Sequence, residues 1–267
     1  MARLMTGGSS QELHATAPVT GVAFTASVFV KTAGSSDALT FALADNSAAT
    51  HYFLLYLRNS TGQGAMQTRA GGAPEILDTG NSFSTGVWQH LCGIWSSNTS
   101  RRLILNGDWA NSATGTTNLT PAGIDIMSFG AMLDSSPSYC SNDCDIGSGA
   151  LWDTSLNQVD VEALADGVCP LFIQPNNLIG WWEIFGVTDP EIDRIGGANL
   201  TLTNSPTKSA HHGIIYRTRR KVFPFTAAAA STIESLGGLH HIGMGMGDPG
   251  VARLPQTLHT IDRGIAL

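Results

Sequence analysis

The sequence predicts an all-β protein: a two-sheet antiparallel β-sandwich of the jelly-roll type, with one short helix and a long C-terminal arm. Apolar stretches recur about every ten residues and are separated by runs rich in Gly, Asn and Ser, as is typical of such sandwiches. Within them, apolar and polar residues alternate with the period of two that a pleated strand requires. Of the 267 residues, 30 are Gly and 13% are charged, a composition typical of turn-rich β proteins.

The clearest element is a predicted β-hairpin with strands Trp88–Trp95 and Arg102–Leu105. The first strand carries apolar residues on both faces, which indicates an inner strand covered by a facing sheet and partly covered on its other side. Ser96–Ser100 contains only Ser, Asn and Thr, whose side chains bond to nearby backbone and favour a reversal. Asn106-Gly107 suits a type I′ turn, because these residues readily adopt positive φ angles. Trp109 is then expected on a third strand.

Further strands are predicted before and after this hairpin. The first of them, residues 22–31, places alternate apolar side chains on one face, and the expected core residues there are Phe24, Ala26, Val28 and Val30. The same pattern predicts strands over residues 39–44, 51–58, 65–69, 178–185 and 199–203.

One short helix is predicted after residue 157. Asn157 can cap it, Val161 and Leu164 lie on one face, and Gly167 with Pro170 ends it. The sandwich pattern ends near Ser205-Pro206. We therefore divide the chain into an N-terminal arm or first strand (1–20), the jelly-roll sandwich (21–210) and a C-terminal extension for assembly contacts (211–267).

Two stretches carry a family pattern. Gly86, Trp88 and His90 form Gly-x-Trp-x-His ahead of a strand that ends in Asn-Gly, and Asp145–Gly167 combines a strand, a Trp, a loop, a short helix and a closing Gly. These residues resemble the concanavalin A-like lectin/glucanase superfamily, in its laminin-G or pentraxin-like branch, over Thr25–Pro206. The resemblance implies the sandwich fold but no single activity, because the superfamily includes lectins, hydrolases, adhesion modules and virion proteins.

Charge and hydropathy narrow the classes of partner. The formal net charge is -7, so the molecule as a whole has no electrostatic reason to bind nucleic acid or an anionic membrane. The first residues lack the apolar core of a secretory signal, and nowhere do about 18 apolar residues run together. We therefore expect no export signal, no membrane span and no nucleic-acid partner.

Four cysteines leave several interpretations open. Cys140 and Cys144 could form half of a zinc site, but Cys92 and Cys169 would have to complete it from distant elements. A disulfide between Cys140 and Cys144, or from that loop to Cys169, requires an oxidising compartment. The simplest interpretation is four thiols, of which two are buried as small hydrophobic groups.

No catalytic residue set is predicted. Glucanases of the superfamily carry Glu-x-Asp-x-x-Glu on one strand, and the nearest approach here is Glu191-Ile-Asp193, with Gly196 in place of the second Glu. His90 is expected as a packed core histidine. We therefore expect a protein that is not an enzyme, and glycoside hydrolysis is only a remote alternative.

Calcium and sugar are the two ligands worth testing. Asp134, Asp143 and Asp145 lie in one predicted loop region and could offer oxygen ligands to calcium, although turn-forming Asp in a solvated loop is the simpler interpretation. Apart from that possible calcium, no cofactor is expected. Among the tryptophans, Trp88, Trp95 and Trp152 are expected in the core. This leaves Trp109 and one of Trp181 or Trp182 as surfaces on which a sugar could stack.

The C-terminal arm suggests a role in assembly. It joins a basic run to an apolar, Gly-rich segment, and its expected partner-binding residues are Arg217, Arg219, Arg220, Lys221, Val222, Phe223, Phe225, Ile233, Leu236 and Leu239. A sandwich with such an arm resembles a decoration (cement) protein of a tailed-bacteriophage head. That resemblance implies a virion location on the capsid surface, synthesis in the host cytoplasm, the major capsid protein as partner, and a homo-oligomer, with a trimer as the guess. The alternative is a carbohydrate-binding, lectin-like module of a virion fibre or host-adhesion protein.

Overall fold

The structure, a computed structural model, describes residues 1–34 and 36–216. It consists of short and medium-length strands with one α-helix and one 3₁₀ turn. The strands are β1 (Ala2–Met5), β2 (Glu12–Thr16), β3 (Phe24–Thr32), β4 (Ala38–Ala44), β5 (His51–Arg58), β6 (Gln63–Ala70), β7 (Glu75–Ser82), β8 (Gln89–Ser97), β9 (Ser100–Leu105), β10 (Ala113–Gly115), β11 (Ile126–Phe129), β12 (Ala131–Met132), β13 (Ser138–Tyr139), β14 (Cys144–Trp152), β15 (Leu178–Trp182), β16 (Thr201–Thr203) and β17 (Thr207–Ser209); the helices are α1 (Gln158–Ala165) and η1 (Pro170–Phe172).

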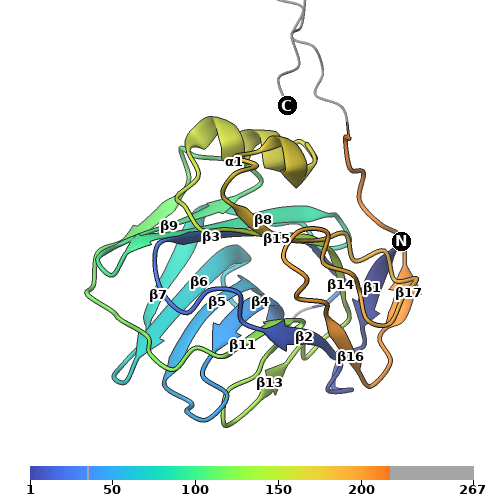
Figure 1. The fold of residues 1–267 in the computed structure, drawn as a ribbon, viewed down its shortest axis with the longest axis horizontal. Helices are drawn as coiled ribbons and strands as arrows, with labels where there is room; N and C mark the ends of the chain where they lie inside the picture. The colour runs from blue at the N-terminus through green and yellow to red at the C-terminus, as the bar shows by residue number, and fades with distance from the viewer. Residues whose placement is uncertain (35, 217–267) are drawn as a thin grey trace, which may run out of the picture. The chain divides into compact units, whose positions relative to one another are not determined.

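Two sheets pack face to face, as Figure 1 shows. The eight-stranded sheet has the order β10-β9-β8-β3-β14-β1-β17, with β15 also paired to β14. The seven-stranded sheet has the order β16-β2-β11-β4-β5-β6-β7, and β12 and β13 form a separate pair. Neighbouring strands run antiparallel throughout, for example β3 with β8 and with β14. The predicted two-sheet antiparallel sandwich is confirmed.

The main core lies between the two sheets. Phe24 on β3 stacks on Trp95 of β8 with ring centroids 4.6 Å apart, and Phe53 of β5 meets Phe24 edge-on at 5.0 Å. All three side chains are buried. Full burial of a large apolar side chain contributes roughly 1.5–3 kcal/mol, so these rings stabilise the contact between the sheets.

A second core covers the outer face of the eight-stranded sheet. It joins Cys92 and Ile104 of the sheet to Val161 and Leu164 of α1, with Trp152 beside them. Figure 1 shows α1 on the outer side of this sheet. Because the sheet is covered on both faces, β8 is apolar on both faces, as the sequence predicted.

The predicted turn and helix cap are present. Asn106 and Gly107 have φ angles of 55° and 72°, and the Asp108 N–H donates to the Leu105 carbonyl at 3.1 Å, as a type I′ turn requires. Asn157 caps α1 by accepting a hydrogen bond from the backbone N–H of Asp160.

Several details differ from the sequence prediction. Trp109 lies in the turn region between β9 and β10, not on a strand. Trp88 is only partly buried, whereas Trp181 and Trp182 are both buried, because β15 packs between the main core and the layer under α1.

The predicted strand boundaries also shift at both ends of the sandwich. The strand expected over 178–185 ends at Trp182, and the one expected over 199–203 begins at Thr201. Of the two alternatives for residues 1–20, an arm or a first strand, the structure has strands, because β1 pairs with β14 and β2 pairs with β11. The ten predicted partner-binding residues of the C-terminal arm lie outside the described residues. Within the described part, no helix has the length and apolar character needed to cross a membrane.

Candidate functional site

A groove of about 280 Å³ opens on the outer face of the eight-stranded sheet, near its β10 edge. Strands β8, β9 and β10, the turn that joins β9 to β10, and the residues just before α1 all contribute to it. Its lining residues are Ile94, Ser96, Ser100, Arg101, Arg102, Trp109, Thr114, Gly115, Thr116, Ser155 and Leu156. The groove therefore combines one aromatic ring, hydroxyl groups and arginines in one place.

The wall of the groove is a stacked arginine and tryptophan. The guanidinium carbon of Arg102 lies 4.4 Å from the centroid of the Trp109 ring, a cation–π contact. Nη1 of Arg102 also donates a hydrogen bond to Oγ of Ser112 at 2.6 Å, and this hydroxyl donates to the Trp109 carbonyl at 2.7 Å. Ser112 thus links the Arg102 guanidinium to the Trp109 backbone, and the guanidinium is held over the Trp109 ring.

The sequence brings these two residues together through the Asn106-Gly107 turn. After the turn the chain reverses, and β10 pairs with β9 so that Thr114 lies opposite Arg102. Trp109 belongs to the connection between these strands and packs against the layer under α1. The turn thus places Trp109 over Arg102.

Arg101, the neighbour of Arg102 on β9, points to the other side of the strand and is buried. Its Nη2 lies 2.6 Å from a carboxylate oxygen of Glu75, and it also donates to the Thr117 carbonyl. Burial raises the pKa of Glu75, but hydrogen bonds from Thr117 and Arg101 outweigh this effect and hold the pKa below its usual value. The charge of Arg101 is therefore balanced, and the ion pair anchors β9 to β7.

Hydroxyl groups surround the stacked pair. Ser155 donates a hydrogen bond to the hydroxyl of Ser96 at 2.8 Å, which ties the segment before α1 to β8. Ser100, Thr114 and Thr116 are exposed on the rim. A hydroxyl both donates and accepts, so these groups can bond to a polyhydroxylated ligand while the ring contacts its apolar C–H face.

Two other cavities offer less chemistry. The larger, of about 790 Å³, is lined mainly by small side chains and backbone between β2 and the 196–199 loop, with His14 and Asn199 as its most polar members. The third, of about 310 Å³, lies between Gly34 and Asp143. Among the described residues, no Phe, Tyr or Trp side chain lines either of these cavities, so the groove at Trp109 is the better candidate binding site.

The three aspartates considered for calcium do not converge. Asp145 forms an ion pair with Lys31 at 2.7 Å, Asp143 accepts a hydrogen bond from the Gly7 N–H, and Asp134 is buried and accepts one from Ser136. Within residues 1–34 and 36–216, no group of three or more His, Cys, Asp or Glu side chains is arranged to hold a metal ion.

The two carboxylates of the Glu191-Ile-Asp193 motif have structural partners. Glu191 accepts a hydrogen bond from Nε of Arg3 at 2.7 Å, with both side chains buried. Asp193 accepts bonds from four backbone N–H groups, those of Trp181, Ile195, Gly196 and Ala198. Neither carboxylate faces the groove.

His90 is a packed core histidine, as predicted, with 1% of its surface exposed. Its Nε2 lies 2.8 Å from Oγ of Ser27, but its Nδ1 has no hydrogen-bond partner, so no third group orients the ring as in a catalytic triad. Burial lowers the pKa of His90 to about 3.

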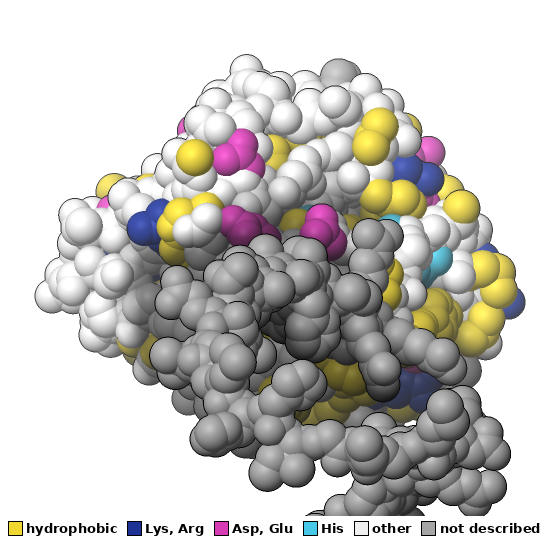
Figure 2. Space-filling model, turned by 90° about the horizontal axis from the view of Figure 1, so that it is seen from above, with side chains coloured by type: hydrophobic (Ala, Val, Ile, Leu, Met, Phe, Trp, Pro, Cys, Tyr) yellow, Lys and Arg dark blue, Asp and Glu magenta, His cyan; other side chains and the backbone are white. Residues whose placement is uncertain are grey.

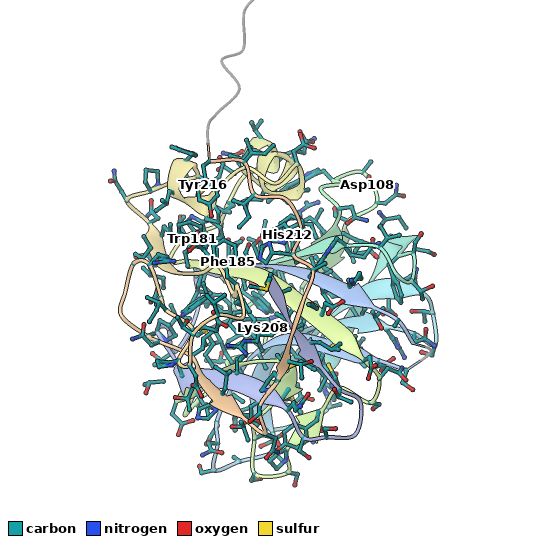
Figure 3. All side chains as sticks on the ribbon, turned by 90° about the vertical axis from the view of Figure 1, so that its right-hand side faces the viewer. Asp108, Trp181, Phe185, Lys208, His212 and Tyr216 are labelled. Carbon is teal, nitrogen blue, oxygen red and sulfur yellow. The ribbon has the colours of Figure 1, made fainter. Side chains whose placement is uncertain are left out.

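His90 belongs to a cluster with two histidines near the end of the described chain. His212 stacks on Phe29 with ring centroids 3.7 Å apart and on His211 at 4.3 Å. Figure 3 shows His212 and Phe185 on the side of the eight-stranded sheet that also carries α1. Burial, followed by the charges of His211 and His90, lowers the pKa of His212 to about 2.

All four cysteines are free and buried. Cys140 and Cys144 lie in the main core with their sulfur atoms 2.7 Å apart, whereas Cys92 and Cys169 lie in the layer under α1. Burial raises the pKa of the Cys92 thiol, which keeps that sulfur protonated. The four thiols do not form one zinc site, and two more of them are buried than the sequence predicted.

Of the residues considered from sequence alone as sugar-stacking surfaces, the structure places Trp109 in the groove and buries Trp181 and Trp182. Sequence reasoning missed Arg102, Ser96 and Ser155. The signal that could have found Arg102 is the Asn-Gly turn, because a turn between Arg102 and Trp109 folds the two side chains toward each other. The contribution of Ser155 comes from a distant segment, and no local pattern marks it.

The chain belongs to the concanavalin A-like lectin/glucanases superfamily, because the Laminin_G_3 family profile of that description matches residues 6–162. A search of curated protein sequences found no match.

Solved structures with a similar fold include a native heptameric SAP-like pentraxin from Limulus polyphemus (14% identity, 61% of this chain and 81% of that chain, TM-score 0.48). Others are the CBM40 module of the Ruminococcus gnavus IT-sialidase bound to α2,3-sialyllactose (14%, 61% and 97%, TM-score 0.47) and a mutant NanB sialidase of Streptococcus pneumoniae (16%, 60% and 27%, TM-score 0.47). The family match does not support the expected capsid-decoration role.

Proposed function

We propose that this protein is a non-catalytic carbohydrate-binding module and that the groove at Trp109 is its binding site. The observation that carries the proposal is the stacked Arg102–Trp109 pair, which lies within a ring of exposed hydroxyl groups. Membership of a lectin and glucanase superfamily supports it. Sugar-binding sites commonly pair an aromatic face with a few polar groups that fix orientation.

The groove is suited to binding without chemistry. Glycoside hydrolysis requires two carboxyl groups across the scissile bond, and none of the lining residues that the structure describes is acidic. The nearest acid, Glu75, is already paired with Arg101 beneath the sheet. A sugar in this groove would therefore be held and not cleaved.

The test is binding of the full-length chain to an oligosaccharide array, followed by titration of each hit against the Trp109→Ala variant. We expect Trp109→Ala to weaken binding by at least about tenfold, because the stacking surface is lost. Phe172→Ala is the matched control, since it removes an exposed aromatic ring outside the groove and should bind like the parent chain.

A second variant distinguishes a loss of binding from a loss of folding. Thr114→Ile keeps a β-branched residue on β10 but removes a rim hydroxyl, so it should weaken binding while the melting temperature stays unchanged. The proposal is wrong if the array gives no hit, or if a hit binds equally well to the parent chain and to Trp109→Ala.

A further inference from the structure

The groove contains a positive charge that no carboxylate balances. Of its two arginines, Arg101 is paired with Glu75, whereas Arg102 has no carboxylate within ion-pair distance in the described structure. Among the described residues, the one side-chain hydrogen bond from its guanidinium goes to the uncharged hydroxyl of Ser112. The remaining N–H donors of Arg102 are therefore available for a ligand.

Arg102 belongs to the minority of described Lys and Arg residues that lack an acid partner. The chain has a net charge of -7, and most of the described Lys and Arg side chains, including Arg3, Lys31, Arg58 and Arg194, already pair with an acid. Figure 2 shows the side of the molecule that carries α1. Among the described residues on this side, charged side chains are scattered singly among uncharged ones. Arg102 is thus one of three described cations, with Arg69 and Lys208, that have no acid partner, and it is the one that lines the groove.

The stacked geometry also suits an anion. A guanidinium is planar and offers its N–H groups in a rigid fork, which matches a carboxylate or sulfate oxygen pair. Stacking on Trp109 and the bond to Ser112 fix the plane of Arg102 before a ligand arrives, so less side-chain freedom is lost on binding. The hydroxyls of Ser100 and Thr114 can donate to the same anion or to the sugar hydroxyls around it.

We infer that the groove selects acidic sugars, meaning pyranose units that carry a carboxylate or sulfate group, and that Arg102 binds this anionic group while the exposed part of Trp109 contacts the ring. The inference rests on the proposed carbohydrate-binding function and assigns its ligand class. Carboxylate and sulfate share the chemistry that Arg102 recognises, so the experiment tests both.

The experiment compares neutral and acidic sugars of the same backbone on the full-length chain. The probes are lactose, sialyllactose and sulfated lactose, together with neutral, uronic-acid and sulfated members of the oligosaccharide array. Binding to the parent chain and to every variant is measured by isothermal titration calorimetry. In the parent chain, the NMR shift of the Trp109 indole N–H, identified by its loss in Trp109→Phe, places the ligand at the groove. We expect at least one acidic probe to bind about tenfold more tightly than its neutral counterpart, with the difference shrinking as salt is added.

Two variants of Arg102 distinguish the effect of its charge on sugar binding from the effect of its packing on Trp109. Arg102→Met keeps an unbranched side chain over Trp109 but removes the charge, so it should reduce acidic sugars to the affinity of the neutral ones. Arg102→Lys keeps the charge without the planar fork and should restore part of the preference.

The outcomes distinguish the inference from the function on which it rests. Equal binding of neutral and acidic partners that is lost in Trp109→Ala overturns the acidic preference and leaves the carbohydrate-binding function standing. Acidic preference that survives Arg102→Met overturns the role of Arg102. Failure of every neutral and acidic probe to bind overturns both.

Discussion

Gly107 shows how a single residue supports both the sheet and the helix above it. Its φ angle of 72° lies in the left-handed region, which costs a residue with a Cβ roughly 1–2 kcal/mol. A Cβ added there would also lie 2.9 Å from Cβ of Ala165 and 3.2 Å from Cα of Glu162, both on α1. The turn therefore packs directly against the helix, and only glycine satisfies both requirements.

We predict that Gly107→Ala lowers the free energy of unfolding by about 2 kcal/mol or more, because backbone strain and the contact with α1 add. Urea denaturation followed by tryptophan fluorescence measures this change. Gly72→Ala is the control, since a Cβ there meets no atom within 4 Å, and it should leave stability unchanged or slightly increased. Equal midpoints for the two variants would contradict the packing argument.

The tryptophans show what could and could not be predicted at the residue scale. Trp95 and Trp152 were correctly expected in the core, because each lies on a strand dense in apolar residues. Trp181 and Trp182 are consecutive and therefore face opposite sides of β15, so sequence alone suggested that one of them is exposed. Both are buried because the layer under α1 covers the outer face, and this layer depends on contacts between segments far apart in the chain.

At the scale of elements, α1 closes the layer over the eight-stranded sheet. It has only eight residues, so its own backbone hydrogen bonds cannot make it stable in isolation. Its position depends on Val161 and Leu164 beneath it and on the cap at its start. In that cap Asn157 accepts from the Asp160 N–H at 3.1 Å, and the Asp160 carboxylate accepts from the Asn157 N–H at 3.4 Å.

We predict that Asn157→Ala destabilises the protein by about 1 kcal/mol, because the Asp160 N–H loses its side-chain acceptor, whereas the backbone N–H of residue 157 can still donate to the Asp160 carboxylate. The denaturation midpoint should fall while its slope stays constant, since the folded surface is unchanged. Val159→Ala is the control on the same helix, because Val159 is 67% exposed and Ala favours a helix. A midpoint for Asn157→Ala equal to that of the parent chain would refute the contribution of the cap.

Element prediction succeeded where the pattern is local. The strands β3, β5 and β8 and the cap of α1 were evident because alternation, turn residues and a capping asparagine lie within a few residues of one another. The strands β7 and β10 were missed, since their sequences are polar and their pairing with β6 and β9 defines them. The groove depends on such pairing between strands, so the sequence pointed to Trp109 alone and not to the residues around it.

At the scale of the whole molecule, the last described residues return across the eight-stranded sheet. The Ile215 N–H donates to the Gly167 carbonyl at 2.7 Å, and the Cys169 N–H donates to the Ile215 carbonyl at 2.9 Å. Nearby, His212 stacks on Phe29 and lies tilted against Trp88, and His211 meets Phe185 edge-on. This segment fastens the end of the sandwich to the residues that follow α1.

The charges around this contact make it sensitive to acid. His212 faces His211, His90 and the N-terminal amino group, and Lys31 lies over the neighbouring Trp88 ring. Glu183 is the acid near His211, and it already pairs with Arg194 and accepts a hydrogen bond from Tyr216. A proton that binds His212 therefore adds a positive charge beside other cationic groups, whereas the nearby carboxylate of Glu183 is already paired.

We predict that the segment around His212 undocks as the pH falls below about 6.5. The pKa of His212 is lowered to about 2 in the folded chain, so the unfolded segment binds protons more readily, and docking loses stability as the pH falls below the unfolded value. With a discount for the partial exposure of His212, the loss attributable to it is about 1 kcal/mol by about pH 5. Amide hydrogen exchange at Ile215 and Cys169, corrected for the intrinsic rate, reports the opening.

His212→Phe isolates this effect. Phenylalanine preserves the stacking on Phe29. The change removes no hydrogen bond at Nδ1 of His212, because that atom has no partner among the described residues. Opening in this variant should depend less on pH than in the parent chain, whereas His14→Gln, on β2 of the seven-stranded sheet, should leave the pH dependence intact. If His212→Phe opens with the same pH dependence as the parent chain, the charge of His212 does not control docking, and burial of His90 beneath the segment becomes the remaining source of acid sensitivity.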